Sequence, residues 1–224
     1  MSSSATREMT SILAGSERRL LRAVAARLPY HILSDHLTIV GVLGAVGAGA
    51  AYALSSLHPA WLWVASAMLA VNWFGDSLDG TLARVRKAER PRYGYYLDHA
   101  VDALDTAVIG IGIGLSPYVS LELALVLVVL YLMLSINVYL ETSVFGVFKM
   151  AYGIVGPTEV RILLVLGNAV LFFAPLLWGA LHATVALFAN AAVALLAAGM
   201  FTLFAVRFGS NLHRLGRMEP VRRR

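Results

Sequence analysis

The chain has 224 residues, of which 59% are hydrophobic and only 14% charged, and its mean hydropathy is +0.74. This composition excludes an ordinary soluble domain and indicates an integral membrane protein. The net charge of +5 does not indicate nucleic-acid binding, which would need a basic, aromatic-rich soluble surface. Because the chain has no cysteine, it has neither a disulfide framework nor a thiolate metal site.

The N-terminal segment, residues 1–33, is predicted to be cytoplasmic and to contain an interfacial helix. Between Leu13 and Leu28, the apolar residues Leu21 and Val24 share one stripe with Leu28, while most of the arginines point elsewhere. Such a pattern is typical of an amphipathic helix that lies in the plane of the lipid headgroups.

The rest of the chain contains long apolar runs, each close to the length of about 20 residues that crosses a hydrocarbon core. The runs cover residues 37–57, 59–75, 97–115, 119–140, 162–179 and 183–206. A barrel is excluded because stretches such as 123–134 are apolar on every face and do not alternate. We therefore predict an all-α integral membrane protein with six transmembrane helices over 34–208, followed by a basic cytoplasmic tail over 209–224.

The basic residues predict the orientation, since Lys and Arg near the ends of spans are retained on the cytoplasmic side. With the N-terminus inside, all 18 Lys and Arg residues fall on that side. The opposite turns, near 57–60, 116–122 and 179–183, contain none. Both termini, and the acidic cluster described next, are predicted to be cytoplasmic.

Four aspartates interrupt the apolar pattern: Asp76 and Asp79 near the end of one run, and Asp98 and Asp102 at the start of the next. Residues three or four apart share a helix face, so two antiparallel helices joined by the basic turn 85–93 would bring both pairs together. An isolated carboxylate at membrane depth costs about 2.5 to 3.5 kcal/mol on insertion scales. The cluster therefore predicts a bound cation. Oxygen ligands favour Mg²⁺ or Mn²⁺, and two such ions suit phosphoryl chemistry.

Small and basic residues lie around these aspartates. Gly80, Ala83 and Gly94 would let a bulky group such as a nucleotide approach the helix backbone, although small residues also promote packing between transmembrane helices. Arg84 has a planar set of donors that suits phosphate, and an arginine at a cytoplasmic helix end is also a common topology anchor.

The pattern D-x2-D-G-x2-A-R-x9-G-x3-D-x3-D, read from Asp76 to Asp102, resembles the signature of the CDP-alcohol phosphotransferases. The resemblance implies six transmembrane helices, an N-terminal interfacial helix, a cytosolic active site and commonly a homodimer. It also implies transfer of a substituted phosphoryl group from a CDP-linked donor to an alcohol, with release of CMP. The four aspartates would bind two divalent metal ions, and Gly80, Ala83, Arg84 and Gly94 would contact the CDP group.

The general base is predicted to be Asp102, which lies deepest of the four aspartates along its helix. His99 is the competitor, because imidazole titrates near neutrality and an Asp-His pair resembles the choline and ethanolamine branch of the family. Residue 99 is, however, about 100° round the helix from Asp98, which favours a supporting role.

Acceptor binding is predicted from four further residues. Asp105 continues the face of Asp98 and Asp102 one turn further, where it either hydrogen-bonds a neighbouring helix or meets the acceptor. Lys149, Arg161 and Arg207 form a basic pocket for an acceptor such as glycerol phosphate or inositol phosphate, or anchor their helix ends.

Three functions remain open at this point. We favour CDP-diacylglycerol as the donor, in phospholipid biosynthesis at the inner membrane of a prokaryote. The Asp98-His99 pair favours a CDP-aminoalcohol donor with a diacylglycerol acceptor. A divalent-cation transporter would also need carboxylates, but the apolar distal half of the helix, over 108–115, offers no polar path to the far side.

Overall fold

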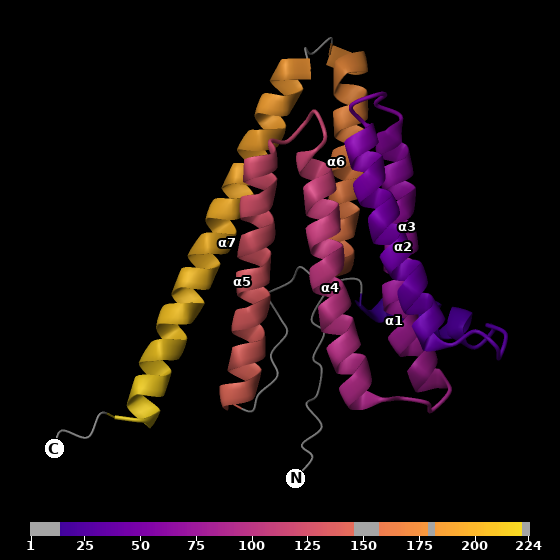
Figure 1. The fold of residues 1–224 in the computed structure, drawn as a ribbon, viewed down its shortest axis with the longest axis vertical. Coiled ribbons are helices and arrows are strands. Elements are labelled where there is room, and N and C mark those ends of the chain that lie inside the picture. Colours follow the sequence, from indigo (N-terminus) through magenta and orange to yellow (C-terminus); the bar gives the residue numbers. More distant parts are fainter. Residues whose placement is uncertain (1–13, 146–156, 179–181, 221–224) are drawn as a thin grey trace.

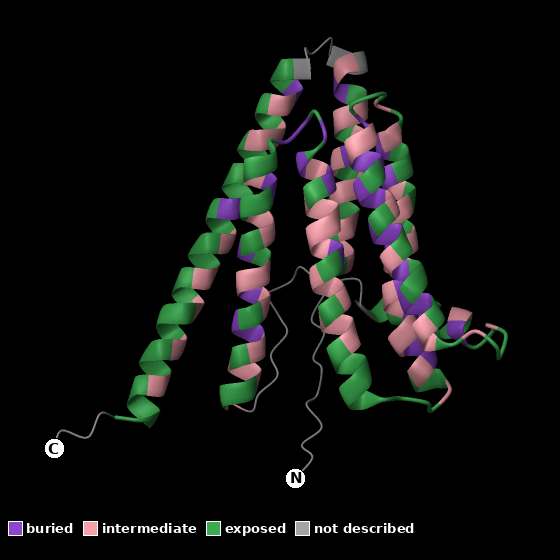
Figure 2. Cartoon of the chain, viewed as in Figure 1, coloured by how far each residue is buried: buried purple, intermediate pink, exposed green. Residues whose placement is uncertain are grey.

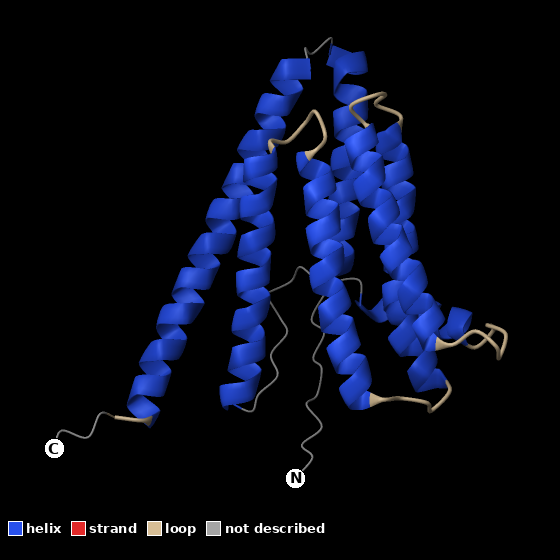
Figure 3. Ribbon diagram, viewed as in Figure 1, coloured by secondary structure: helices blue, strands red, loops and turns tan. Residues whose placement is uncertain are grey.

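The computed structural model describes residues 14–145, 157–178 and 182–220, and within these ranges the secondary structure consists of seven α-helices without strands (Figure 3). The helices are α1 (Ala14–Ala25), α2 (Ser34–Leu54), α3 (Trp61–Val85), α4 (Pro91–Gly114), α5 (Leu121–Phe145), α6 (Pro157–Trp178) and α7 (His182–Met218). The prediction of an all-helical chain is confirmed.

Among the residues that the structure describes, four helices are long and apolar enough to cross a membrane: α2, α5, the Pro157–Pro175 part of α6 and the Ala183–Met218 part of α7. Helices α3 and α4 are of similar length, but asparagine and aspartate residues lower their apolar character. The structure thus supports integration in the membrane through four helices, and the count of six spans stays a prediction.

The predicted boundaries differ from the observed ones where polar residues continue a helix. Helix α3 extends to Val85, ten residues beyond the apolar run 59–75, and it carries Asp76 and Asp79 within it. Helix α7 continues to Met218 and therefore includes the start of the predicted tail 209–224. A run of apolar residues marks the part of a helix that suits lipid, whereas the helix itself ends where its backbone hydrogen bonds end.

Glycines bring α2 and α3 into backbone contact. A Cβ atom on Gly75 would lie 2.5 Å from the Leu37 carbonyl oxygen and 2.6 Å from the Gly41 Cα atom. A Cβ atom on Gly44 would lie 2.8 Å from the Asn72 Cα atom. Both distances are far too short for a real side chain, so small residues allow these two helices to pack closely.

Helix α2 packs in the same way on its other neighbour, α4. A Cβ atom on Gly112 would lie 2.7 Å from the Gly49 carbonyl carbon. Helix α2 thus lies against both α3 and α4, the two helices that carry the aspartates (Figure 1). It fixes the position of each relative to the other.

Burial is concentrated in α2 and α3, whereas α5 and α7 expose much of their surface (Figure 2). Large apolar side chains such as Leu187, Phe188 and Leu195 on α7 are more than two-thirds exposed, at 67%, 69% and 76%. An apolar surface of this extent is the one expected to face hydrocarbon.

Helix α1 lies against the end of the α2–α3 pair. Its buried residues Leu21 and Ala25 pack with Leu37 of α2 and with Leu78 and Leu82 of α3. This arrangement agrees with an amphipathic helix whose arginines, Arg18, Arg19 and Arg22, are exposed.

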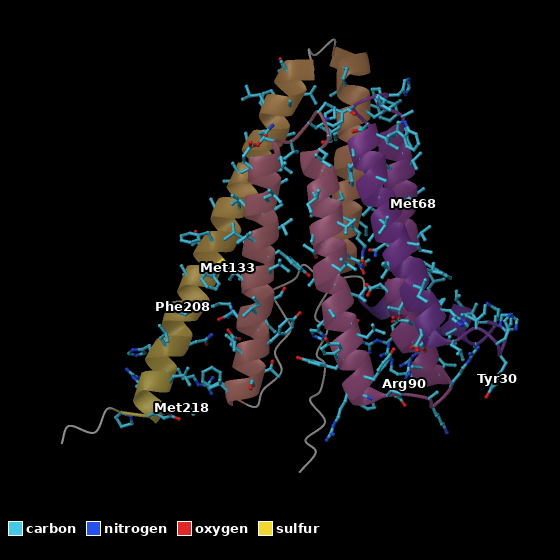
Figure 4. The ribbon with its side chains drawn as sticks, in the orientation of Figure 1. Tyr30, Met68, Arg90, Met133, Phe208 and Met218 are labelled. Atoms are coloured by element: carbon cyan, nitrogen blue, oxygen red, sulfur yellow. The ribbon has the colours of Figure 1, made fainter. Side chains whose placement is uncertain are left out.

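The segment between α1 and α2 is held by the first residue after α3. The Arg86 guanidinium donates hydrogen bonds to the carbonyl oxygens of Leu28 at 3.1 Å, Pro29 at 2.9 Å and Ile32. It also lies 5.5 Å from the centre of the Tyr30 ring. Tyr30 and Arg90 are labelled at this same end of the molecule in Figure 4.

Candidate active site

The four aspartates lie at one end of the helix bundle, on either side of the loop that joins α3 to α4. Asp76 and Asp79 are in the second half of α3, and Asp98 and Asp102 are in the first half of α4. Asp79 lies within electrostatic reach of Asp76 and Asp98, and Asp102 lies within reach of Asp76, Asp98 and Asp105. The fold therefore brings both pairs into one acidic region.

Asp76 forms an ion pair with Arg161 of α6. The Nη2 atom of Arg161 donates to the Asp76 Oδ2 atom at 2.9 Å, and both side chains are largely shielded, with 15% and 23% of their surface exposed. The Arg161 Nε atom donates at 2.9 Å to Asn72 Oδ1. The guanidinium is thus held at two points by α3.

Asn72 connects this ion pair to Asp105 of α4. The Asn72 side chain is fully buried, and its Nδ2 atom donates to Asp105 Oδ2 at 2.6 Å and to the Gly41 carbonyl oxygen at 3.0 Å. The second oxygen of Asp105, Oδ1, is also buried. A continuous polar chain therefore runs from Asp76 through Arg161 and Asn72 to Asp105, across three helices.

Asp79 is held by α2 and by its own helix. Thr38 Oγ1 donates to the Asp79 Oδ2 atom at 2.6 Å, and the Gly80 backbone N–H donates to Oδ1. Thr38 lies in the first turns of α2, where the close packing with α3 places its hydroxyl against the carboxylate.

His99 packs among aromatic rings next to Asp98. Its Nδ1 atom lies 2.7 Å from the Tyr95 carbonyl oxygen and 3.7 Å from Asp98 Oδ2. Its ring centre is 4.1 Å from that of Tyr95 and 4.8 Å from that of Tyr139 on α5. A carbonyl oxygen only accepts, so Nδ1 carries a proton in this arrangement. These contacts favour the supporting role predicted for His99.

The carboxylates suit divalent cations chemically, because all of their donors are oxygens. As arranged in the described ranges, however, no three Asp, Glu, His or Cys side chains converge closely enough to hold a metal ion. The Arg161 guanidinium binds the Asp76 Oδ2 atom and the Thr38 hydroxyl binds the Asp79 Oδ2 atom, so a cation at either oxygen would have to compete with these donors. The positions seen do not form a metal site, and the two-metal prediction stays a prediction.

The residues predicted to contact a nucleotide lie at the loop end of α3 and α4. A Cβ atom on Gly80 would lie 3.3 Å from the Arg84 Nη1 atom, so the arginine side chain lies across the surface of the glycine. The Arg84 Nη2 atom donates to Thr81 Oγ1 at 3.1 Å. Gly94 borders open space, since a Cβ there would meet no other atom within 4 Å. Ala83 is half-buried beside Arg84.

The predicted acceptor residues are divided between two places. Arg161 and Asp105 belong to the polar chain that includes Asp76. Arg207 of α7 instead binds Glu141 of α5, through Nη2 to Oε2 at 2.5 Å and Nε to Oε1 at 3.2 Å. Lys149 lies outside the described residues.

Glu141 is a polar residue that the sequence analysis missed. Its Oε1 atom also accepts from Asn137 Nδ2 and from Asn211 Nδ2, both at 2.6 Å. The cluster joins α5 to α7 and satisfies the carboxylate inside an apolar helix pair. Asn72 was missed as well, although an asparagine inside the apolar run 59–75, one turn before Asp76, shares the face of that aspartate.

Comparison with known proteins adds two relatives. Over 92 residues the chain is 35% identical to an archaetidylinositol phosphate synthase from Methanothermobacter thermautotrophicus, covering 41% of this chain and 43% of that protein. Over 84 residues it is 33% identical to a phosphatidylinositol phosphate synthase from Cutibacterium acnes, covering 38% of each. The chain thus matches less than half the length of either relative.

A family model covers much more of the chain. The model for CDP-alcohol phosphatidyltransferase matches residues 31–203, a range that begins just before α2, contains all four aspartates and ends within α7. The members of this family are enzymes that transfer substituted phosphate groups. The chain belongs to the CDP-alcohol phosphatidyltransferase family.

Proposed function

We propose that this chain transfers a phosphatidyl-type group from a CDP-linked lipid to an alcohol, with release of CMP. The donor that we favour is CDP-diacylglycerol. The observation that carries the proposal is the acidic region formed by α3 and α4 within the range matched by the family model. In this reaction the acceptor hydroxyl oxygen attacks the lipid-bearing phosphorus. The bond from that phosphorus to the bridging oxygen breaks, and CMP leaves.

The proton of the acceptor hydroxyl must pass to a base, and we assign that role to Asp102. Asp102 lies on α4 within electrostatic reach of Asp76 and Asp98 on one side and of Asp105 on the other. A carboxylate among other carboxylates holds a proton more readily than an isolated one. His99 is the weaker candidate because its ring packs between Tyr95 and Tyr139.

We also propose that Asp76, Asp79, Asp98 and Asp102 are the ligands of two divalent cations, Mg²⁺ or Mn²⁺, once Arg161 releases Asp76. Bound cations would supply the positive charge that offsets the diphosphate of the donor. Arg84 lies across the surface of Gly80, and we propose that it contacts the CDP phosphates while the open space at Gly94 admits the nucleotide.

For the acceptor we propose a phosphorylated polyol such as inositol phosphate. The two relatives, both named as inositol phosphate lipid synthases, support this class. Arg161, beside the acidic region, is the described residue best placed to bind its phosphate. The aminoalcohol alternative depends on His99, whose aromatic packing argues against a catalytic role.

Orientation and assembly complete the proposal. The exposed residues Arg84, Lys87, Arg90 and Arg92 lie at the same end of α3 and α4 as the aspartates, which supports a cytoplasmic active site. We further propose that the membrane is a prokaryotic inner membrane. We propose a homodimer, in which part of the exposed apolar surface would be covered by a second copy.

Purified protein supplied with CDP-diacylglycerol, radiolabelled inositol phosphate and Mg²⁺ is expected to release CMP and to form a labelled lipid. EDTA should abolish both products, and excess Mg²⁺ or Mn²⁺ should restore them, because the aspartates alone repel the diphosphate. Lipid chromatography and CMP detection measure the outcome. Turnover that is indifferent to EDTA would contradict the metal proposal, and metal transport without CMP release would favour a transporter.

Replacing Asp105 with leucine, which has a similar shape but no acceptor for the Asn72 amide, is expected to raise the KM for the acceptor about tenfold and to leave the KM for the CDP-linked donor nearly unchanged. The reason is that Asp105 holds Asn72, which in turn holds the Nε atom of Arg161. Steady-state kinetics with each substrate varied in turn separates the two constants. An equal rise in both, or loss of the folded protein, would count against an acceptor-side role for Asp105.

A further inference from the structure

Glu17 of the N-terminal helix α1 joins two of the long helices. Its Oε1 atom accepts a hydrogen bond from Trp73 Nε1 of α3 at 2.7 Å and another from Thr158 Oγ1 of α6 at 2.9 Å. The Ser77 hydroxyl of α3 lies 3.4 Å from the same oxygen. One carboxylate oxygen thus meets donors from two helices that are far apart in the chain.

The burial of Glu17 differs from that of its neighbours. Ser16 and Arg18 on either side are exposed, whereas Glu17 is half-buried between α3 and α6. An amphipathic helix needs only apolar residues on its inner face to dock, and Leu21 and Ala25 provide these. Docking of α1 therefore does not require the Glu17 carboxylate, whose hydrogen bonds instead join α3 to α6.

Glu17 acts close to the acidic region. On α3, its partner Trp73 lies three residues before Asp76, and its partner Ser77 directly follows Asp76. On α6, its partner Thr158 lies three residues before Arg161, on the same face of the helix. The first turns of α6 are consequently tied to α3 at two points, through Glu17 and through the Arg161–Asp76 ion pair.

We infer that Glu17 is a positioning residue that fixes the start of α6 against α3 and thereby sets where the Arg161 guanidinium stands relative to Asp76. Hydrogen bonds to a carboxylate are stronger than those between neutral groups, so this junction resists sliding of α6 along α3. Its relevance to catalysis rests on the proposed function, in which Arg161 binds the acceptor phosphate.

Two substitutions separate the hydrogen bonds from the packing. Glu17→Gln keeps an oxygen that accepts from Trp73 and Thr158, whereas Glu17→Met keeps the length of the side chain and removes the acceptor. Because the chain has no cysteine, a V85C/V160C pair places spin labels only at the exposed ends of α3 and α6. Pulsed electron paramagnetic resonance then measures the distance between the two helices.

We expect a narrow distance distribution with Glu17 and with Glu17→Gln, and a broadened or shifted one with Glu17→Met. Thr158→Val, which removes only the α6 donor, should broaden the distribution as well and serves if the Met variant does not fold. The matched control is Glu122→Met, an exposed glutamate at the start of α5, which should leave the distribution narrow. An unchanged distribution in Glu17→Met or in Thr158→Val would overturn the inference.

Kinetics provide the second readout. Glu17→Met is expected to raise the KM for inositol phosphate about tenfold, the effect of losing a hydrogen bond to a charged group, with the KM for CDP-diacylglycerol unchanged and rescue by Glu17→Gln. Equal changes in both constants, or no rescue, would overturn the positioning role. An unaltered chain without transferase activity would refute the proposed function alone, because the distance measurement needs no turnover.

Discussion

Asp76→Asn is expected to reduce CMP release by about a hundredfold or more. Even outer partners of metal ligands lower activity by about 10- to 100-fold when mutated, and Asp76 is a proposed ligand. Asparagine retains an oxygen that accepts from the Arg161 Nη2 atom, so the contact between α3 and α6 should survive. The measurement is the initial rate of CMP release at saturating donor and acceptor.

The matched control for this substitution is Glu89→Gln. Glu89 is exposed in the loop between α3 and α4, so the change removes the same charge near the same end of the molecule. It should leave the rate unchanged. If Asp76→Asn retained the rate of the unaltered chain, the assignment of the acidic region as the active site would be wrong.

Gly75→Ala is expected to destabilise the protein by about 3 kcal/mol, the upper end of the usual range for overpacking. The added Cβ atom would meet the Leu37 carbonyl oxygen at 2.5 Å and the Gly41 Cα atom at 2.6 Å. These are backbone atoms, which cannot turn aside as a flexible side chain can. Helices α2 and α3 must therefore separate, which lowers the thermal midpoint measured in detergent.

Gly167→Ala is the control, because a Cβ on this α6 glycine would meet no other atom within 4 Å. Alanine has the higher helix propensity, by about 1 kcal/mol, so this variant should be as stable as the unaltered chain or slightly more so. A Gly75→Ala variant with an unchanged midpoint would show that α2 and α3 do not pack as closely as described.

The sequence predicted where the helices lie along the chain better than it predicted which side chains pair between them. Apolar runs of sufficient length locate the long helices, because burial of every face in lipid requires such runs. The same criterion located α3 and α4 but not their full length, because polar residues such as Asp76 and Asp79 end the apolar run within the helix. The residues that we propose to bear the chemistry are also the ones that weaken the signal of a membrane span.

Within the acidic region, local spacing predicted which aspartates share a face, but it could not predict that the guanidinium of Arg161 pairs with Asp76. Arg161 is 85 residues from Asp76 along the chain, and the sequence assigned it to an acceptor pocket together with Arg207. In the structure Arg207 forms an ion pair with Glu141 instead. Such pairings depend on how helices pack, which periodicity within one helix does not contain.

The attachment of α1 determines how deep the acidic region lies relative to the membrane surface. Leu21 and Ala25 fasten α1 to α3 just beyond Asp79, and Arg86 clamps the segment that follows α1. Since α1 is predicted to lie at the level of the lipid headgroups, it would fix the depth of this end of the protein in the membrane. Thickening or thinning of the bilayer would then be absorbed at the far ends of the helices. The proposed water-soluble acceptor and the proposed lipid donor would still meet at the same depth.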